Sequence, residues 1–188
     1  MAELLLFHHA LGQTPGFLGF ADEVRAAGHS VHTPDSYDGH VFDDLDAGVA
    51  YAQAMGHVEL FARASAVAAE LPPDLVFGGF SLGSGQAQYL AQTRPGALGA
   101  LLYHDGIPLT EFSPEWPNGV GLQIHTSEAD PWVDLATCRE LAAAVPESDL
   151  FIYPGTAHLF ADPSSAEYEP EAAALLMQRT LAFLASRP

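Results

Sequence analysis

Lysine is absent from this sequence, and arginine provides all six of its basic residues. The chain carries 24 acidic residues, so its formal net charge at pH 7 is −18. A surface this acidic repels the phosphate backbone of nucleic acids and the anionic surfaces of membranes. We therefore expect neither a nucleic acid nor a membrane as a partner.

Cysteine and long apolar runs are also scarce. The one cysteine, Cys138, excludes an intrachain disulfide, which is typical of proteins in a reducing compartment. No segment has the ~20 consecutive apolar residues of a membrane-spanning helix. The short apolar run at 4–7 lacks the basic flank and the small-residue cleavage site of a signal peptide. We therefore expect a cytoplasmic protein with a buried strand near its N-terminus.

Apolar residues are plentiful, at 48% of 188, which suffices for the core of one globular domain over residues 1–188. Short apolar runs alternate with longer segments of helical periodicity. Gly48 and Gly56 weaken the longest of these segments and leave open its division into two helices. The pattern predicts strands at 4–8, 31–33, 75–80, 100–103, 120–126 and 150–153, and helices at 15–27, 43–71, 84–93, 135–144 and 170–186.

Strands that are continuously apolar and alternate with helices indicate an α/β fold. The expected architecture is a mostly parallel sheet of about six strands with helices on both faces. In such sheets, ligand sites form beyond the carboxyl ends of the strands. A candidate functional residue is therefore expected directly after a strand.

The pentapeptide Gly79–Gly83 (GFSLG) matches G-x-S-x-G, a nucleophile elbow in which a sharp strand-to-helix turn exposes a serine. An apolar strand at 75–80 precedes it, and a helical segment at 84–93 follows it. Glycines flank Ser81 because larger side chains would collide in so tight a turn. The alternative interpretation is a glycine-rich turn in which the serine caps the helix.

An elbow serine needs a base, and the base needs an acid to orient it. His158 follows the strand at 150–153 and Asp130 follows the strand at 120–126, so both meet the strand-end criterion. They also come in the order serine, acid, histidine that this arrangement requires. A solvated loop histidine and a helix-capping aspartate are the alternatives, and Asp105 competes for the acidic role.

The oxyanion formed during acyl transfer needs two backbone donors. One is expected to be the N–H of Leu82, directly after the nucleophile. The other is expected in the loop after the first strand, at the N–H of Ala10, with the neighbouring His9 as a second candidate. The doublet of His8 and His9 also suggests a metal ligand pair, but adjacent strand residues point to opposite faces. We therefore expect no metal site.

Taken together, these motifs resemble those of the dienelactone hydrolase family of α/β-hydrolases. The pentapeptide at 79–83 stands at the family's nucleophile elbow. Residues 128–133 (EADPWV) resemble the family's acid loop, and residues 153–160 (YPGTAHLF) resemble its catalytic histidine loop. Residues 28–37 and the helix ending at 178–184 extend the resemblance over most of the chain. The resemblance implies a reduced α/β-hydrolase fold and an enzyme that hydrolyses ester bonds.

Three departures separate this chain from the family members that act on dienelactone. Ser81 stands where the family typically has a cysteine, and Cys138 lies in a predicted helix and is no substitute. His9 stands where those members carry a glutamate, and Asp162 occupies a stretch in which they carry an arginine for the substrate carboxylate. At a net charge of −18 an anionic lactone is an unfavourable substrate. The family's named substrate is therefore not carried over.

The expected activity is that of a serine hydrolase that acts on a small-molecule ester or lactone through Ser81, His158 and Asp130. No cofactor is expected, and the protein is expected to be a monomer or a homodimer. The loop at 104–119 is a candidate partial lid. A thioesterase or other acyl hydrolase, and a non-catalytic domain that binds a small ligand, are the alternatives. Candidate substrate contacts are His9, Tyr37, Trp116, Trp132 and Phe160.

Overall fold

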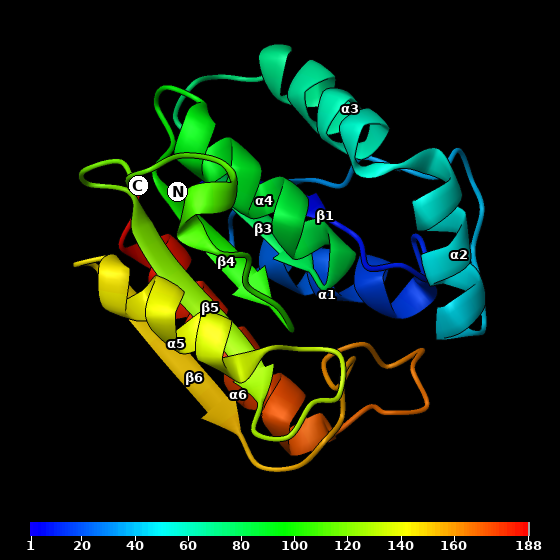
Figure 1. The fold of residues 1–188 in the computed structure, drawn as a ribbon. Coiled ribbons are helices and arrows are strands. Elements are labelled where there is room, and N and C mark those ends of the chain that lie inside the picture. The colour runs from blue at the N-terminus through cyan, green and yellow to red at the C-terminus, as the bar shows by residue number, and fades with distance from the viewer. Residues whose placement is uncertain (188) are drawn as a thin grey trace.

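The structure, a computed structural model, describes residues 1–187, and these form a parallel sheet flanked by helices (Figure 1). Within them the sheet has six strands in the order β2-β1-β3-β4-β5-β6, and every neighbouring pair is parallel. The predicted α/β architecture is therefore confirmed. The strands are β1 (Glu3–Phe7), β2 (Ser30–His32), β3 (Val76–Phe80), β4 (Gly99–Tyr103), β5 (Gly121–Ser127) and β6 (Ser148–Tyr153).

Helices cover both faces of the sheet. α1 and α6 pack on one face, and α3, α4 and α5 pack on the other, while α2 packs against α3 (Figure 1). None of the helices that the structure describes combines the length and the apolar character needed to cross a bilayer. The helices are α1 (Pro15–Ala26), α2 (Leu45–Met55), α3 (His57–Ala69), α4 (Leu82–Thr93), α5 (Leu135–Ala144) and α6 (Pro170–Ala185), and a short 3₁₀ turn covers Leu109–Glu111.

The alternation of side chains along β1 divides the core into two layers. Leu4 and Leu6 point to the face that α1 and α6 cover, whereas Leu5 and Phe7 point to the face that α3, α4 and α5 cover. All four side chains are fully buried. A strand that is buried on both faces has no polar side, which is why residues 4–7 of β1 are a continuous apolar run in the sequence.

Local signals set the ends of the helices that approach the strand ends. Thr14 caps α1 by accepting a hydrogen bond from a first-turn N–H, and Pro15 occupies the first helical position. Asp44 caps α2 in the same way. Gly56, with a positive φ of 85°, ends α2 and separates it from α3. The segment predicted as helical at 43–71 is therefore two helices, the division that its glycines left open.

Element boundaries differ from the predicted ones where polar residues or glycines hide the pattern. α4 begins at Leu82 rather than at residue 84, because its glycine-rich first turn lacks a helical signature. β6 begins at Ser148 rather than at residue 150, because this edge strand is only half-buried and its first residues are polar. Both differences lie at element ends, where sequence periodicity is weakest.

Candidate active site

Ser81 lies at the sharp turn between the end of β3 and the start of α4. Its backbone adopts φ 49° and ψ −110°, a conformation that residues with side chains rarely adopt. A Cβ on Gly79 would lie 2.0 Å from the carbonyl oxygen of Gly83, and a Cβ on Gly83 would lie 2.5 Å from that of Phe7. The two glycines of the pentapeptide are therefore required by close backbone packing.

The structure brings Ser81, His158 and Asp130 into one hydrogen-bonded chain. The Ser81 Oγ lies 2.7 Å from Nε2 of His158, and Nδ1 of His158 lies 2.7 Å from Oδ2 of Asp130. Both His158 and Asp130 are buried. With Nδ1–H donated to the carboxylate, Nε2 is left to accept the serine hydroxyl. This arrangement can support a nucleophile, its general base and the acid that orients the base.

The contacts of these residues differ from those that the alternative interpretations require. The Ser81 side chain makes no capping hydrogen bond to α4. Asp134, rather than Asp130, caps α5 by accepting from a first-turn N–H. The competing acid, Asp105, accepts from the N–H of Gly106 rather than from the imidazole. The histidine is buried rather than solvated.

Further hydrogen bonds hold the histidine loop in place. Oε2 of Glu167 accepts from the N–H of His158 at 3.1 Å and from that of Leu159 at 3.2 Å. At the residue before His158, the Ser127 hydroxyl donates to the carbonyl of Ala157 at 2.6 Å. The loop is thus tied before and after His158. These partners belong to other parts of the chain, and no local motif marks them.

The N–H groups of Leu82 and Ala10, the predicted oxyanion donors, have no acceptor within the described residues. Leu82 is the first residue of α4, where N–H groups lack an intrahelical partner. In the loop after β1 the N–H groups of Leu11 and Gly12 are hydrogen-bonded, whereas that of Ala10 is not. Leu82 and Ala10 both line a cavity that contains Ser81. The two amides are therefore available to a ligand at this position.

Two cavities meet at Ser81 and share Leu82, His57 and Asp105 in their walls. The larger has a volume of about 210 Å³ and contains His158. The smaller has a volume of about 100 Å³ and does not contain it. The remaining wall residues are Ala10, Val49, Ala52, Gln53 and Trp132 in the larger cavity, and Leu60, Phe61, Gly85, Gln86 and Ile107 in the smaller.

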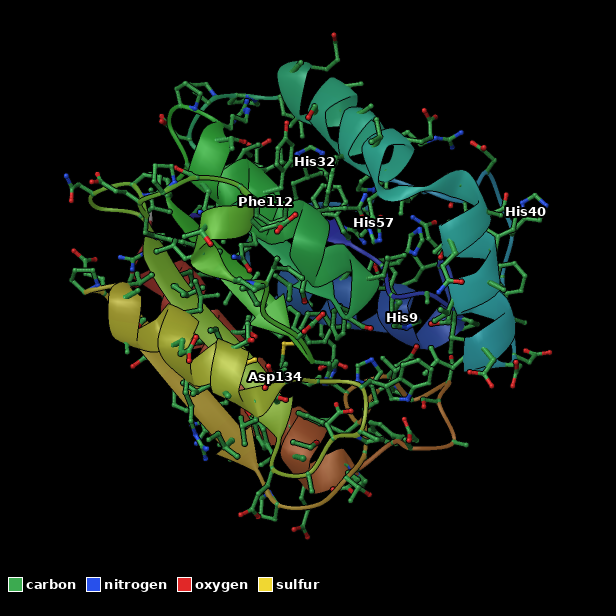
Figure 2. The ribbon with its side chains drawn as sticks, viewed as in Figure 1. His9, His32, His40, His57, Phe112 and Asp134 are labelled. Atoms are coloured by element: carbon green, nitrogen blue, oxygen red, sulfur yellow. The ribbon has the colours of Figure 1, made fainter. Side chains whose placement is uncertain are left out.

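His57 and Asp105 are wall residues that the sequence pattern did not assign to substrate binding. His57, labelled in Figure 2, is the first residue of α3 directly after Gly56, and it lines both cavities. Asp105 follows β4, at the same edge of the sheet as Ser81. Burial raises the pKa of its carboxyl group to about 6. The strand-end criterion pointed to Asp105, but only as a competitor of Asp130 for the acid that orients His158.

Three of the predicted substrate contacts lie in the core instead of the cavities. Tyr37, Trp116 and Phe160 are buried, and none of them lines a cavity at Ser81. The Tyr37 hydroxyl donates to a carbonyl in α2, and the Trp116 indole N–H donates to a carbonyl just before β5, so each polar tip has an internal partner. Phe160 packs in the apolar layer beneath α1 and α6. Trp132 does line the larger cavity and is 47% exposed.

His9, the fifth predicted contact, is also buried and lines neither cavity. Its Nε2 lies 2.7 Å from Oδ2 of Asp162, and the Thr14 hydroxyl donates to the same oxygen at 2.6 Å. Its Nδ1 accepts from the N–H of Leu11 at 3.3 Å. Burial alone would raise the pKa of Asp162, but the hydrogen bonds from His9 and Thr14 outweigh it and hold the pKa below its ordinary value.

The histidine doublet does not converge on one point. His8 accepts a hydrogen bond from the N–H of Ser36, whereas His9 contacts Asp162. Within residues 1–187 there is no group of three or more histidine, cysteine, aspartate or glutamate side chains placed to hold a metal ion. The two rings therefore have separate structural partners.

The loop at 104–119, predicted as a candidate lid, is tied to α4. The Gln88 side chain donates to the carbonyl of Ile107 at 2.8 Å and accepts from its N–H at 2.9 Å. Gln92 donates to the carbonyl of Leu109 at 3.0 Å. With these three bonds, the first part of the loop forms a wall of the smaller cavity.

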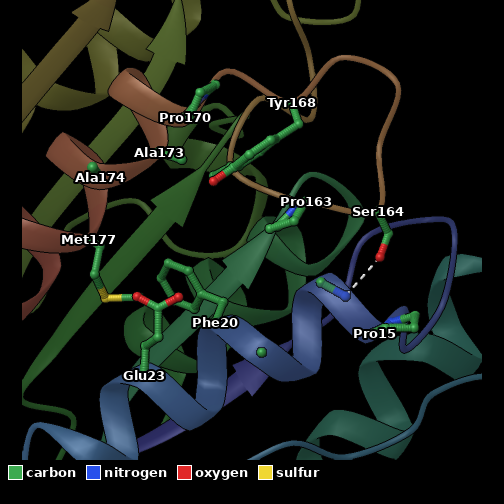
Figure 3. Close-up of a pocket in the computed structure, with 13 residues that line it drawn as sticks. Pro15, Phe20, Glu23, Pro163, Ser164, Tyr168, Pro170, Ala173, Ala174 and Met177 are labelled. Carbon is green, nitrogen blue, oxygen red and sulfur yellow. Dashed lines mark hydrogen bonds between the residues drawn. The ribbon is translucent and has the colours of Figure 1, made fainter.

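Larger cavities lie away from Ser81. One of about 370 Å³ lies between α1, α6 and the segment that carries Pro163 and Tyr168 (Figure 3). Another, of about 460 Å³, lies between residues 41–46 and residues 164–167. Neither contains Ser81 or a complete nucleophile and base pair. The candidate site is therefore identified by the hydrogen bonds that join Ser81, His158 and Asp130, and not by the volume of a cavity.

Comparisons with known proteins agree with this architecture. The family model for the dienelactone hydrolase family matches residues 4–187. A dienelactone hydrolase-like promiscuous phosphotriesterase from metagenomic libraries superposes with a TM-score of 0.79 at 18% identity, over 100% of this chain and 87% of that chain. A cold-adapted esterase from an Arctic intertidal metagenomic library superposes with a TM-score of 0.66 at 18% identity, over 99% of this chain and 82% of that chain.

A curated relative matches a shorter segment. The "Putative carboxymethylenebutenolidase" of Azospirillum brasilense is 40% identical over 65 residues. That alignment covers 33% of this chain and 28% of the relative. The match therefore concerns about a quarter of that protein's length, and the structural similarities, at under a fifth identity, establish the fold.

Proposed function

The chain belongs to the dienelactone hydrolase family, and from this premise we propose that it hydrolyses a small carboxylic ester or lactone through an acyl-enzyme on Ser81. The observation that carries the proposal is the hydrogen-bonded chain from Ser81 through His158 to Asp130, with 2.7 Å at both links. A serine, a histidine and an aspartate arranged in this way supply a nucleophile, a general base and an orienting acid.

In the proposed first step, the Ser81 Oγ attacks the substrate carbonyl carbon while Nε2 of His158 accepts the hydroxyl proton. Negative charge develops on the carbonyl oxygen, and the free N–H groups of Ala10 and Leu82 are the proposed donors that stabilise it. A single donor of this kind is worth about 10²–10³-fold in rate. The imidazolium then returns its proton to the leaving alkoxide, which departs as an alcohol from an ester and stays on the acyl chain as a hydroxyl when the substrate is a lactone.

In the proposed second step, a water molecule attacks the acyl carbon while His158 accepts one of its protons. Collapse of the tetrahedral intermediate releases the carboxylic acid and restores the Ser81 hydroxyl. The Asp130 carboxylate stays ionised and stabilises the imidazolium in both steps. Apart from the substrate and water, every reacting group in these two steps belongs to the protein. The proposed mechanism therefore calls for no cofactor or metal.

The proposed substrate is uncharged. Among the described residues no arginine lines either cavity at Ser81, whereas Asp105 lines both. The net charge of −18 adds a long-range repulsion of anions. A substrate that carries a carboxylate would therefore be disfavoured both at the cavity wall and during approach.

The test is hydrolysis of p-nitrophenyl acetate and butyrate by the wild type, Ser81→Ala and Ser65→Ala. Ser65 lies on α3 and outside both cavities, so Ser65→Ala is a matched control for the loss of one hydroxyl. We expect turnover by the wild type and by Ser65→Ala, and a loss of at least about 10⁴-fold in Ser81→Ala. A fluorophosphonate should label the wild type at Ser81.

Equal rates for the wild type and Ser81→Ala, together with no labelling by the fluorophosphonate, would overturn the proposal. Labelling without turnover of either ester would retain the nucleophile and show that simple esters are poor substrates. A faster reaction with the matching thioesters would move the activity to the thioesterase class.

A further inference from the structure

The two cavities at Ser81 differ in their access to the general acid. His158 lines the cavity of about 210 Å³ and not the cavity of about 100 Å³. The leaving oxygen must lie within hydrogen-bond reach of the imidazole that protonates it. The alcohol part of the substrate therefore occupies the larger cavity, which also has the half-exposed Trp132 in its wall.

The acyl part stays bonded to Ser81 after the alcohol leaves, and the smaller cavity is the space that remains for it. Its volume of about 100 Å³ is well below the ~300–1,000 Å³ that drug-sized ligands occupy. Apolar wall residues come from α3, from the start of α4 and from the loop after β4. They are Leu60, Phe61, Leu82 and Ile107. A cavity of this size accepts a short acyl chain.

Two polar side chains in this wall, those of Gln86 and Asp105, present acceptor atoms to which no described group donates. Gln86 is buried, and its side-chain N–H₂ donates to the carbonyl of Leu60 at 3.2 Å, which sets the orientation of the amide. The Gln86 Oε1 is then left buried with no partner in the described chain. Asp105 accepts one bond, from the N–H of Gly106 to Oδ1, and no described group donates to its Oδ2.

An unpaired buried acceptor such as the Gln86 Oε1 is costly unless a ligand supplies the donor. A hydroxyl on the acyl chain would do so, whereas a carboxylate would meet the Asp105 carboxyl group unfavourably. A plain alkyl chain fits the volume but leaves both acceptors unpaired. The wall thus favours a chain that is apolar for most of its length and carries one donor.

We propose that the substrate is an open-chain ester of a short hydroxy acid, whose acyl chain lies in the cavity between α3 and α4 with its free hydroxyl donated to Asp105. Asp105 is then a specificity-determining residue. This inference rests on the proposed function, since it assumes that Ser81 carries the acyl group.

The first test concerns which cavity holds the acyl chain. A Cβ on Gly85, which lines only the smaller cavity, would lie 3.9 Å from Phe61 and 4.0 Å from Ile107, so Gly85→Ala fits without strain and narrows the space. Trp132→Ala, which alters the larger of the two cavities at Ser81 and not the smaller, is the matched variant. The measurement is kcat/KM over two ester series, one with acyl chains of two to six carbons and one with increasing alcohols.

We expect Gly85→Ala to lower kcat/KM for the longer acyl chains relative to acetate by about tenfold or more, because one misplaced methylene has an effect of this size. Its profile over the alcohol series should keep the shape of the wild type's. Trp132→Ala should change the alcohol series and leave the shape of the acyl series. The reverse pattern would overturn the assignment of the cavities while leaving the serine hydrolase proposal intact.

The second test concerns the hydroxyl. Ethyl 3-hydroxybutyrate and ethyl butyrate differ by one hydroxyl, and their kcat/KM ratio is compared in the wild type, Asp105→Asn and Asp105→Leu. We expect the wild type to prefer the hydroxy ester by about tenfold to a hundredfold, the range for a hydrogen bond to a charged group. The preference should fall in Asp105→Asn, which keeps a neutral acceptor, and vanish in Asp105→Leu.

An unchanged ratio in Asp105→Leu would overturn the role of Asp105 in specificity. A wild type that hydrolyses both esters with no preference would overturn the hydroxy-acid inference. A wild type that is inactive on all esters and is not labelled at Ser81 would instead refute the proposed function, so the two failures are distinguishable.

Discussion

Two buried histidine–aspartate pairs lie at the carboxyl ends of the strands, and they differ in what the second imidazole nitrogen contacts. His158 and Asp130 are joined at 2.7 Å, and so are His9 and Asp162. In the first pair the free nitrogen faces the hydroxyl of Ser81 at a cavity. In the second pair it accepts from a backbone N–H and reaches no cavity at Ser81. Proton-transfer chemistry is therefore open only to the first pair.

The positions of the hydroxyl groups sharpen this difference. In the first pair, the Ser81 hydroxyl bonds to the imidazole, so the base can take its proton. In the second pair, the Thr14 hydroxyl bonds to the Asp162 carboxylate instead, and its oxygen also caps α1. The same three functional groups thus form the proposed nucleophile and base in one place and a structural brace in the other.

The second pair joins two segments that carry parts of the candidate site. His9 precedes Ala10, whose N–H is the proposed oxyanion donor, and Asp162 follows the histidine loop. Oδ1 of Asp162 also accepts from the N–H of Ser164 at 2.7 Å. We infer that this brace sets the spacing between the oxyanion donor and the imidazole.

The largest expected effect comes from breaking the first pair by Asp130→Asn. The amide can no longer hold the imidazole in the tautomer that accepts the serine proton, so kcat/KM for p-nitrophenyl acetate should fall by about 10⁴-fold. Asp134→Asn is the matched control, because Asp134 is exposed and caps α5, a position that asparagine also fills well. Retention of more than a tenth of wild-type activity in Asp130→Asn would contradict the assignment of the acid.

Breaking the second pair should act on stability more than on rate. Asp162→Ala leaves His9 and Thr14 without their buried acceptor, and the free energy of unfolding, measured with urea, should fall by about 3–5 kcal/mol. The double variant His9→Leu/Asp162→Leu removes both partners and should recover part of this loss. If Asp162→Ala instead lowered kcat as much as Asp130→Asn at unchanged stability, the second pair would be part of the catalytic machinery.

Asp105 extends the comparison, because it is a partly buried carboxyl group without an imidazole partner. Burial raises its pKa from 3.8 to about 6, so the folded state binds the proton more tightly than the unfolded state does. Its contribution to stability is therefore most favourable below about pH 4 and is lost as the pH rises through about 6. Asp105→Asn removes the buried charge and should raise the free energy of unfolding by about 3 kcal/mol at pH 7.5.

The pH dependence distinguishes this effect from a change in packing. At pH 5 the wild-type carboxyl is already protonated in the folded state, so the gain from Asp105→Asn should shrink to about half. Urea unfolding of the wild type and of Asp105→Asn at pH 5 and at pH 7.5 gives the change in the free energy of unfolding at each pH. A gain that is the same at pH 5 and pH 7.5 would show that the substitution acts through packing rather than through charge.

Much of the architecture could be predicted because it depends on local patterns. Continuous apolar runs such as β1 and β3 predicted strands buried on both faces, and their alternation with helices predicted the parallel sheet. The strand-end criterion then selected Ser81, Asp130 and His158 from one serine motif, 24 acidic residues and nine histidines. The structure brings these three side chains together because parallel strands end at one edge of the sheet.

The contacts of the other candidates could not be predicted in this way. His9 and Asp162 are 153 residues apart, and no periodicity reports that they meet. Tyr37 and Phe160 follow strands as Trp132 does, and Trp116 lies in the loop before β5, yet all three of these side chains are buried in the core. The direction of a loop side chain depends on which elements pack against it, and that information is absent from the spacing of residues.

The sequence by itself determined the fold class and the order of the elements. It also determined the candidate residues Ser81, Asp130 and His158, because each follows from residue type and from a position directly after a strand. Only the tertiary structure decided which histidine–aspartate pair reaches a cavity and which one is sealed. It also decided that His57, Gln86 and Asp105 share the walls around Ser81. These outcomes depend on distances between segments far apart in the chain, which are set when the helices close over the sheet.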